Sequence, residues 1–147
     1  MPSLNLIDPT LKDLITMIWN ERENDLNMNS LKETSEFITC IERFGSQWEG
    51  LIEEAVKDML YELKTFEAGH EYVVLNDKIG YKEQDNTVFD ISYGYKTLFA
   101  YFMENERGKI SEDSLNENIS ILVRLGTFSY AEIPKDFHSI LGKIFLK

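Results

Sequence analysis

A row of carboxylates is the most chemically suggestive feature of this sequence. Glu54, Asp58 and Glu62 follow one another at intervals of four residues in a segment with helical periodicity. Residues at this spacing lie on one face of a helix, about 6 Å apart, and like charges there cost about 0.2–0.5 kcal/mol per pair. The row is therefore either a solvated face that aids solubility or a ridge that binds a cationic partner. Its spacing also imitates a row of backbone phosphates.

A second acidic region combines carboxylates with tyrosines. Between residues 71 and 93 these two residue types alternate in a segment with the composition of short strands and turns. Tyrosine is frequent at binding hot spots, and carboxylates form charge-assisted hydrogen bonds with Arg and Lys. We expect a surface for a basic partner here, and its aromatic residues make us prefer it to the helical row. The alternative is that about half of these rings fill the core between sheet and helices. The predicted contact residues are Tyr72, Asp77, Tyr81, Glu83, Asp85, Asp90 and Tyr93.

Patterns for catalysis or metal binding are weak by comparison. Cys40 is the only cysteine and lies among apolar residues, where we expect a small core residue rather than a nucleophile. His70 and His138 are the only imidazoles, and their spacing matches no zinc pattern, so we predict no metal site. The glycines form neither a dinucleotide-binding motif nor a P-loop, so we predict no cofactor. A small hydrolase that uses the aspartates of the strand region as acid and base stays an alternative.

The first half of the chain has the periodicity of helices. Asp8-Pro9 is a helix start, and the apolar spacing that follows predicts a helix over 9–26. Two S-x-x-E patterns, at Ser30–Glu33 and Ser46–Glu49, resemble capping boxes and predict the starts of a second and a third helix. The glycines that should end these helices are Gly45 and Gly69. Short turns between them predict a three-helix bundle.

The second half has mixed character. Three short strands, over 71–75, 79–83 and 87–93, should form an antiparallel meander. Helices are predicted over 95–106, from 111 to 126, and from Pro134 onward, whereas 127–133 is either a loop or an edge strand. The predicted fold is therefore helix-rich α+β, with the N-terminal bundle packed against the small meander and further C-terminal helices. The length suits a single domain over 1–147, with a helical half (1–69) and a mixed half (70–147).

Charge limits the classes of partner. The chain has 26 acidic and 15 basic side chains, a net charge of -11; residues 1–69 hold fourteen against six (-8), and 70–147 hold twelve against nine (-3). Such a field repels nucleic acid and anionic membranes and attracts basic proteins. With no apparent signal peptide, no long apolar run and a single cysteine, we expect a cytoplasmic protein. The oligomeric state is not predictable from these features.

These features together resemble bacterial immunity proteins as a class, which are small, acidic and cytosolic and lack catalytic motifs. The resemblance implies neutralisation of a basic toxin, often a nuclease, by covering its cationic active site. The chain departs from the small helical immunity proteins of DNase bacteriocins in its length and its predicted sheet. We predict an acidic binding or inhibitor protein rather than an enzyme. The alternatives are a phage-type nucleic-acid mimic that inhibits a defence protein, acting through the row that begins at Glu54, a small carboxylate-dependent hydrolase, and a structural or oligomerisation module.

Overall fold

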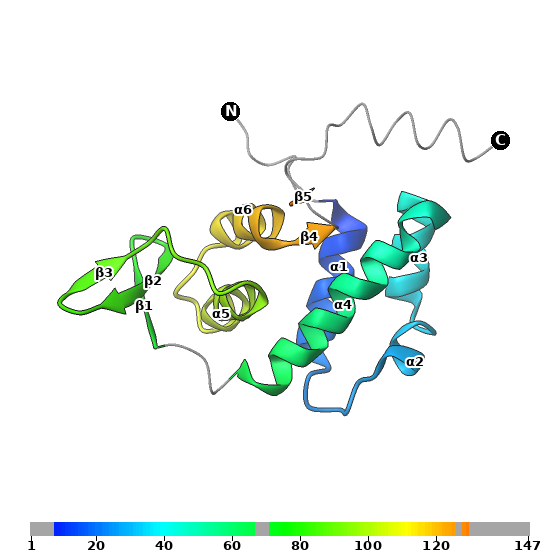
Figure 1. Cartoon of the computed structure of the whole chain (residues 1–147), viewed down its shortest axis with the longest axis horizontal. Helices are drawn as coiled ribbons and strands as arrows, with labels where there is room; N and C mark the ends of the chain where they lie inside the picture. Colours follow the sequence, from blue (N-terminus) through cyan, green and yellow to red (C-terminus); the bar gives the residue numbers. More distant parts are fainter. Residues whose placement is uncertain (1–7, 67–70, 126–127, 130–147) are drawn as a thin grey trace.

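The computed structural model describes residues 8–66, 71–125 and 128–129 of the chain. Within them the N-terminal helices pack together, a three-stranded antiparallel meander follows, and two more helices complete the predicted helix-rich α+β fold. Figure 1 shows the meander at one end of the molecule and α1 to α4 at the other, with α5 and α6 between them. The elements are α1 (Pro9–Asn20), α2 (Met28–Leu31), α3 (Ser35–Phe44), a 3-10 turn (Ser46–Trp48), α4 (Glu49–Lys64), β1 (Tyr72–Leu75), β2 (Lys78–Glu83), β3 (Asn86–Val88), α5 (Tyr95–Glu106), α6 (Glu112–Leu122), β4 (Arg124–Leu125) and β5 (Phe128–Ser129).

Helix α1 begins where the sequence predicts and ends earlier than predicted. The Asp8 carboxylate accepts hydrogen bonds from the backbone N–H groups of Thr10 and Leu11, at 2.9 and 3.4 Å, as an N-cap should. At the other end the Arg22 guanidinium donates to the Trp19 carbonyl at 2.8 Å and stacks over the Trp19 ring. This side chain satisfies a terminal carbonyl, and the chain leaves the helix after Asn20 instead of continuing to residue 26.

The two S-x-x-E patterns do not cap helices. Asn27 caps the short α2, and its reciprocal partner is Ser30, which lies inside that helix. A new helix, α3, begins after Thr34, whose hydroxyl caps it by accepting a hydrogen bond from the Phe37 N–H at 3.2 Å. The single second helix that was predicted is therefore two helices. Ser46 lies in the 3-10 turn, and α4 begins at Glu49 without a side-chain cap. Several polar residues compete for the cap at each start, and the pattern alone does not select among them.

The meander follows the predicted turns. Leu75 pairs with Lys78 across a two-residue turn in which Asn76 and Asp77 have φ of 53° and 62°, the conformation of a type I′ hairpin. The third strand ends at Val88 and is therefore shorter than the predicted 87–93. Gly80 in β2 leaves room for Phe89, since a Cβ there would lie 2.7 Å from that ring.

The C-terminal part follows the prediction except at the end of α6, which stops at Leu122 rather than at the predicted 126 because the chain continues into β4. Helix α5 spans the predicted 95–106, and Ser111 caps α6 by accepting from the Ser114 N–H at 3.1 Å. Strands β4 and β5 pair antiparallel, so part of 127–133 is an edge strand. The helix predicted from Pro134 lies outside the described residues. In the ranges that the structure covers, no helix is long and apolar enough to cross a membrane.

Trp19 joins α1 to α5 in the middle of the core. Its ring stacks on Phe99 with centroids 5.7 Å apart and also contacts Phe66 and Phe102. Its indole N–H donates to the Glu106 carboxylate at 3.1 Å, so the ring's polar atom is satisfied as well. This buried side chain therefore packs together three segments of the chain.

Replacing Trp19 with alanine should lower the free energy of unfolding by about 3–5 kcal/mol, because the cavity left in the core removes both burial and ring contacts. Urea denaturation followed by circular dichroism measures this change. The control is Tyr61→Ala on the exposed side of α4, which should change stability by less than about 0.5 kcal/mol. Equal losses in the two variants would show that Trp19 has no special place in the core.

Candidate functional site

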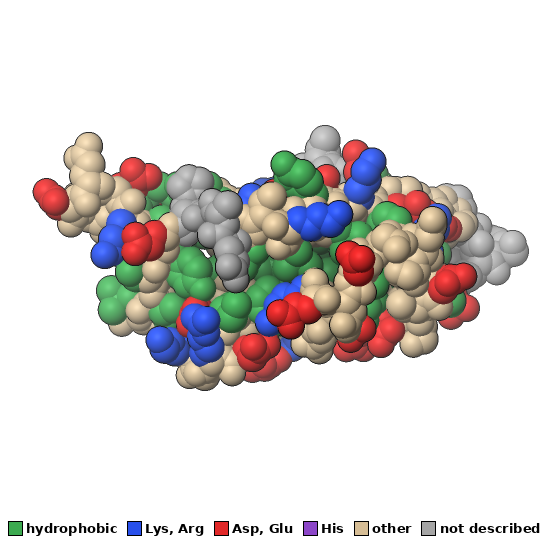
Figure 2. Space-filling view, turned by 90° about the horizontal axis from the view of Figure 1, so that it is seen from below, with side chains coloured by type: hydrophobic (Ala, Val, Ile, Leu, Met, Phe, Trp, Pro, Cys, Tyr) green, Lys and Arg blue, Asp and Glu red, His purple; other side chains and the backbone are tan. Residues whose placement is uncertain are grey.

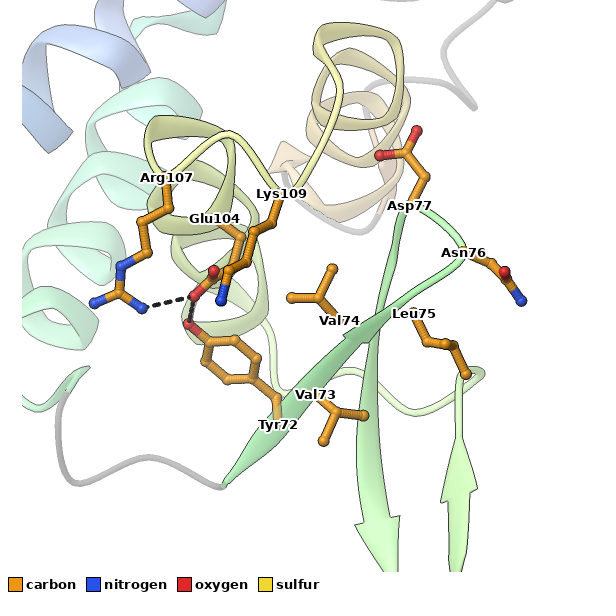
Figure 3. Close-up of a pocket in the computed structure, with 9 residues that line it drawn as sticks. All are labelled: Tyr72, Val73, Val74, Leu75, Asn76, Asp77, Glu104, Arg107 and Lys109. Carbon is orange, nitrogen blue, oxygen red and sulfur yellow. Dashed lines mark hydrogen bonds and ion pairs between the residues drawn. The ribbon is translucent and has the colours of Figure 1, made fainter.

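A groove of about 760 Å³ runs along β1 and beneath the end of α5. Figure 3 shows strand β1 on one side of it and the side chains of Glu104, Arg107 and Lys109 on the other. The groove brings together residues more than 30 positions apart in the sequence, since Tyr72 and Glu104 both line it. The remaining lining residues are Val73, Val74, Leu75, Asn76 and Asp77.

Glu104 is a buried carboxylate at the base of this groove, with only 3% of its surface exposed. The Tyr72 hydroxyl donates to it at 2.7 Å, and Arg107 forms an ion pair with it at 3.0 Å (Figure 3). Burial, together with the hydrogen bond to Glu104, raises the pKa of Tyr72, so its hydroxyl stays protonated and keeps donating. The carboxylate is satisfied in the way that buried charges require.

Asp77 has a structural role in joining the meander to α6. Its carboxylate accepts from the Ser111 backbone N–H at 2.7 Å and from the Ser111 hydroxyl. The Ser114 hydroxyl donates to the Asp77 carbonyl at 2.6 Å. Both carboxylates that line the groove are therefore bonded to neighbouring elements. This arrangement favours a role in positioning over the acid and base pair that a hydrolase needs.

The tyrosines of the meander are buried or half-buried, and are less exposed than a surface that contacts a partner would need. Tyr81 is 3% exposed, and its hydroxyl lies 2.7 Å from the Thr97 hydroxyl of α5. This corrects the prediction that its ring faces a partner. Tyr93 is half-buried with its ring edge-on to Tyr81, and its backbone N–H donates to Thr97. The acids of this region, Glu83, Asp85 and Asp90, are exposed.

The predicted acidic row on α4 is interrupted at its third member. Glu54 and Asp58 are exposed, but Glu62 is half-buried and forms an ion pair with Lys96 of α5 at 3.2 Å. Tyr61 lies instead on the face of Glu54 and Asp58, seven residues beyond the first and three beyond the second, and is 65% exposed. We call Glu54, Asp58 and Tyr61 the α4 surface. Tyr61 is not among the predicted contact residues, although its helical spacing from the two acids was a usable signal.

A second groove, of about 600 Å³, lies between α1 and the segment that leads into α3. Asp13, Glu21 and Glu36 supply three carboxylates, and no Lys or Arg lines it within the described part of the chain. A smaller hollow of about 200 Å³ shares Asp13 and Glu36 with it. Asp13 and Glu21 belong to α1 and its C-cap, whereas Glu36 belongs to α3, so no single spacing in the sequence indicated the groove. The other lining residues are Thr16, Met17, Asn20, Leu26 and Thr34.

Among the described residues, no group of three or more His, Cys, Asp or Glu side chains could hold a metal ion. Cys40 is fully buried in α3, as the apolar residues around it predict. Burial raises the pKa of its thiol to about 12, and the nearby Asp8 carboxylate adds to the effect. Because the thiolate is the reactive form, this cysteine is poorly suited to act as a nucleophile.

At pH 8 the Cys40 thiol of the folded protein should react with a disulfide reagent at least about 10-fold more slowly than that of the unfolded chain, because burial raises its pKa to about 12 and shields it from the reagent. Because the pKa of this thiol is higher in the folded state than in the unfolded chain, its protonation stabilises the fold. This contribution is fully present below about pH 9 and is lost as the pH rises from about 9 to 12. Absorbance measurements with and without guanidinium test the first point. Cys40→Ala, which should lose less stability in that alkaline range, tests the second. Equal reaction rates in both states would show that the thiol is accessible.

Comparison with protein-family models found none that matches the chain. Searches of curated proteins and of solved structures also found no match. The functional argument therefore depends on the surfaces of this chain itself.

Proposed function

We propose that this chain is a binding protein that recognises a basic protein partner through the α4 surface, as an inhibitor of the immunity-protein class would. The observation that carries the proposal is the exposure of Tyr61 beside the exposed carboxylates of Glu54 and Asp58. An aromatic ring beside carboxylates is a combination that binds Arg and Lys side chains, through cation–π contact and charge-assisted hydrogen bonds. The sequence predicted this combination in the meander, where Tyr81 is buried instead.

The α4 surface is carried by a helix that is held in place by the core. On the opposite face of the same helix, Ile52, Val56 and Met59 are buried in the core. A ring held on such a helix loses little freedom on binding, which is why tyrosine is frequent among residues that dominate binding energy. The surface is therefore able to bind without rearrangement of the backbone.

The rest of the surface favours a basic partner. In Figure 2, Asp and Glu side chains are numerous over the helical half of the visible face, where some Lys and Arg side chains also lie. The groove at Asp13 and Glu36 adds further carboxylates to the helical half. A field of this sign speeds the approach of a cationic protein and slows that of nucleic acid.

The nucleic-acid mimic and the hydrolase have less support. In a nucleic-acid mimic the row from Glu54 to Glu62 would dominate, but Glu62 is paired with Lys96. In a hydrolase a free acid and base would converge in a pocket, whereas Glu104 and Asp77 are bonded to structural partners. A binding protein needs neither feature.

The immobilised full chain, exposed to lysate of the cell that encodes it, should retain basic proteins at low ionic strength and release them at high ionic strength. For the main protein retained, Glu54→Lys with Asp58→Lys should weaken binding by at least about 30-fold, and Tyr61→Ala by about 10-fold or more. Isothermal titration calorimetry measures both affinities.

The matched control is Asp85→Lys with Asp90→Lys in the meander. Both double variants replace two negative charges with two positive ones and change the net charge from -11 to -7, so they differ only in where the change lies. A loss confined to the meander variant would show that the α4 surface is not the contact. Retention of no basic protein at low ionic strength would reject the proposed class of partner.

A further inference from the structure

The outer edge of β1 lacks the features by which natural sheets protect their edges. Its sequence, Tyr-Val-Val-Leu, has no charge and no proline, and in the described part of the chain no strand pairs with its outer side. The opposite edge, β3, is only three residues long and lies between Asp85 and Asp90. Short strands and flanking charges discourage pairing, whereas an uncharged edge such as β1 invites it.

The turn geometry shows which backbone groups β1 offers. In a two-residue hairpin the residues that flank the turn, Leu75 and Lys78, form the hydrogen-bonded pair. Bonded and non-bonded pairs alternate along antiparallel strands, so the backbone groups of Val74 and Tyr72 point away from β2. The Ile79 N–H is consistent with this alternation, because it donates to the Tyr101 hydroxyl at 3.1 Å rather than to Val74. Two donors and two acceptors therefore face outward.

The groove beside this edge indicates which side chains a partner strand would carry if it paired with β1. Arg107 and Lys109 reach toward the Tyr72 end of β1 (Figure 3). Arg107 is paired with Glu104, and Lys109 is exposed and forms no ion pair with any described residue. On the opposite face of the strand Leu75 is 52% exposed. An added strand therefore meets the Lys109 ammonium group on one face and the apolar Leu75 side chain on the other.

We propose that a partner protein adds an extended segment to the outer edge of β1, with an Asp or Glu side chain beside Lys109 and apolar side chains on the opposite face. Strand addition of this kind uses backbone hydrogen bonds for affinity and alternate side chains for specificity. A second copy of this chain fits less well, because two chains of net charge -11 repel and β1 has no acidic side chain to place beside Lys109. The proposal goes beyond binding at the α4 surface and does not depend on it.

A phage-displayed library of linear peptides, selected on the full chain, tests this proposal. We expect selected peptides with alternating apolar residues and a fixed Asp or Glu. Val74→Pro should weaken the best peptide by at least about 10-fold, because it removes an outward N–H; proline is tolerated at such an edge position since no bond to β2 is lost. Lys109→Glu should weaken that peptide and favour its Lys-substituted counterpart. Fluorescence anisotropy measures each affinity, and circular dichroism checks the fold.

Two controls make the result specific. Glu54→Lys with Asp58→Lys should leave peptide binding unchanged, so failure of the α4 surface and failure of this edge are separately visible. Val73→Pro removes a backbone hydrogen bond to Gly80 and should reduce stability. Such a loss would confirm that the backbone groups of Val73 point toward β2 and those of Val74 point away from it. The proposal is wrong if no alternating peptide is selected, or if Val74→Pro binds the peptide as wild type does. It is also wrong if the wild-type chain sediments as a dimer that Val74→Pro dissociates.

Discussion

The burial of α5 on all sides is the constraint on which the rest of the structure depends. The helix has apolar residues around its whole circumference, including Leu98, Phe99 and Phe102, as expected of a helix enclosed by other elements. The N-terminal helices cover one side, and the meander covers another (Figure 1). A sheet of three short strands is not stable alone, so it must be fastened to this helix. Hydroxyl groups do so, since Tyr81 bonds to Thr97.

This fastening explains why the tyrosines of the meander are not the exposed surface that their sequence suggested. Tyr72 and Tyr81 are cross-strand partners, and the hydroxyl of each bonds to α5, through Glu104 and Thr97 respectively. Tyr72 and Tyr81 lie within the strands, whereas Asp77 and Asp85 lie in the turns and Glu83 lies at the end of β2. The rings pack on the helix, and acids such as Asp85 remain in exposed turns. Composition alone does not distinguish this arrangement from a mixed surface.

Sequence reasoning succeeded where the signal was local. The apolar spacing in 95–106 predicted α5, and the polar pair Asn76–Asp77 marked the hairpin turn. It failed where the outcome depended on distant partners. Glu62 does not extend the exposed acidic row, because it forms an ion pair with Lys96, 34 residues away in the sequence. The groove beside β1 needs Tyr72 and Glu104 to meet, and no spacing rule connects positions 32 apart.

Charge and backbone pairing act over different ranges, and this separates the two proposed surfaces. The field of an acidic chain extends about 8 Å at physiological ionic strength and governs how fast a basic protein arrives. Strand pairing acts only at hydrogen-bond distance, about 3 Å, and salt affects it little. Acids such as Glu54 would therefore set association rates, and the edge of β1 would set dissociation rates. A partner that uses both must be basic on one side and present an acidic extended strand on another. A partner that uses one surface shows the salt dependence of that surface alone.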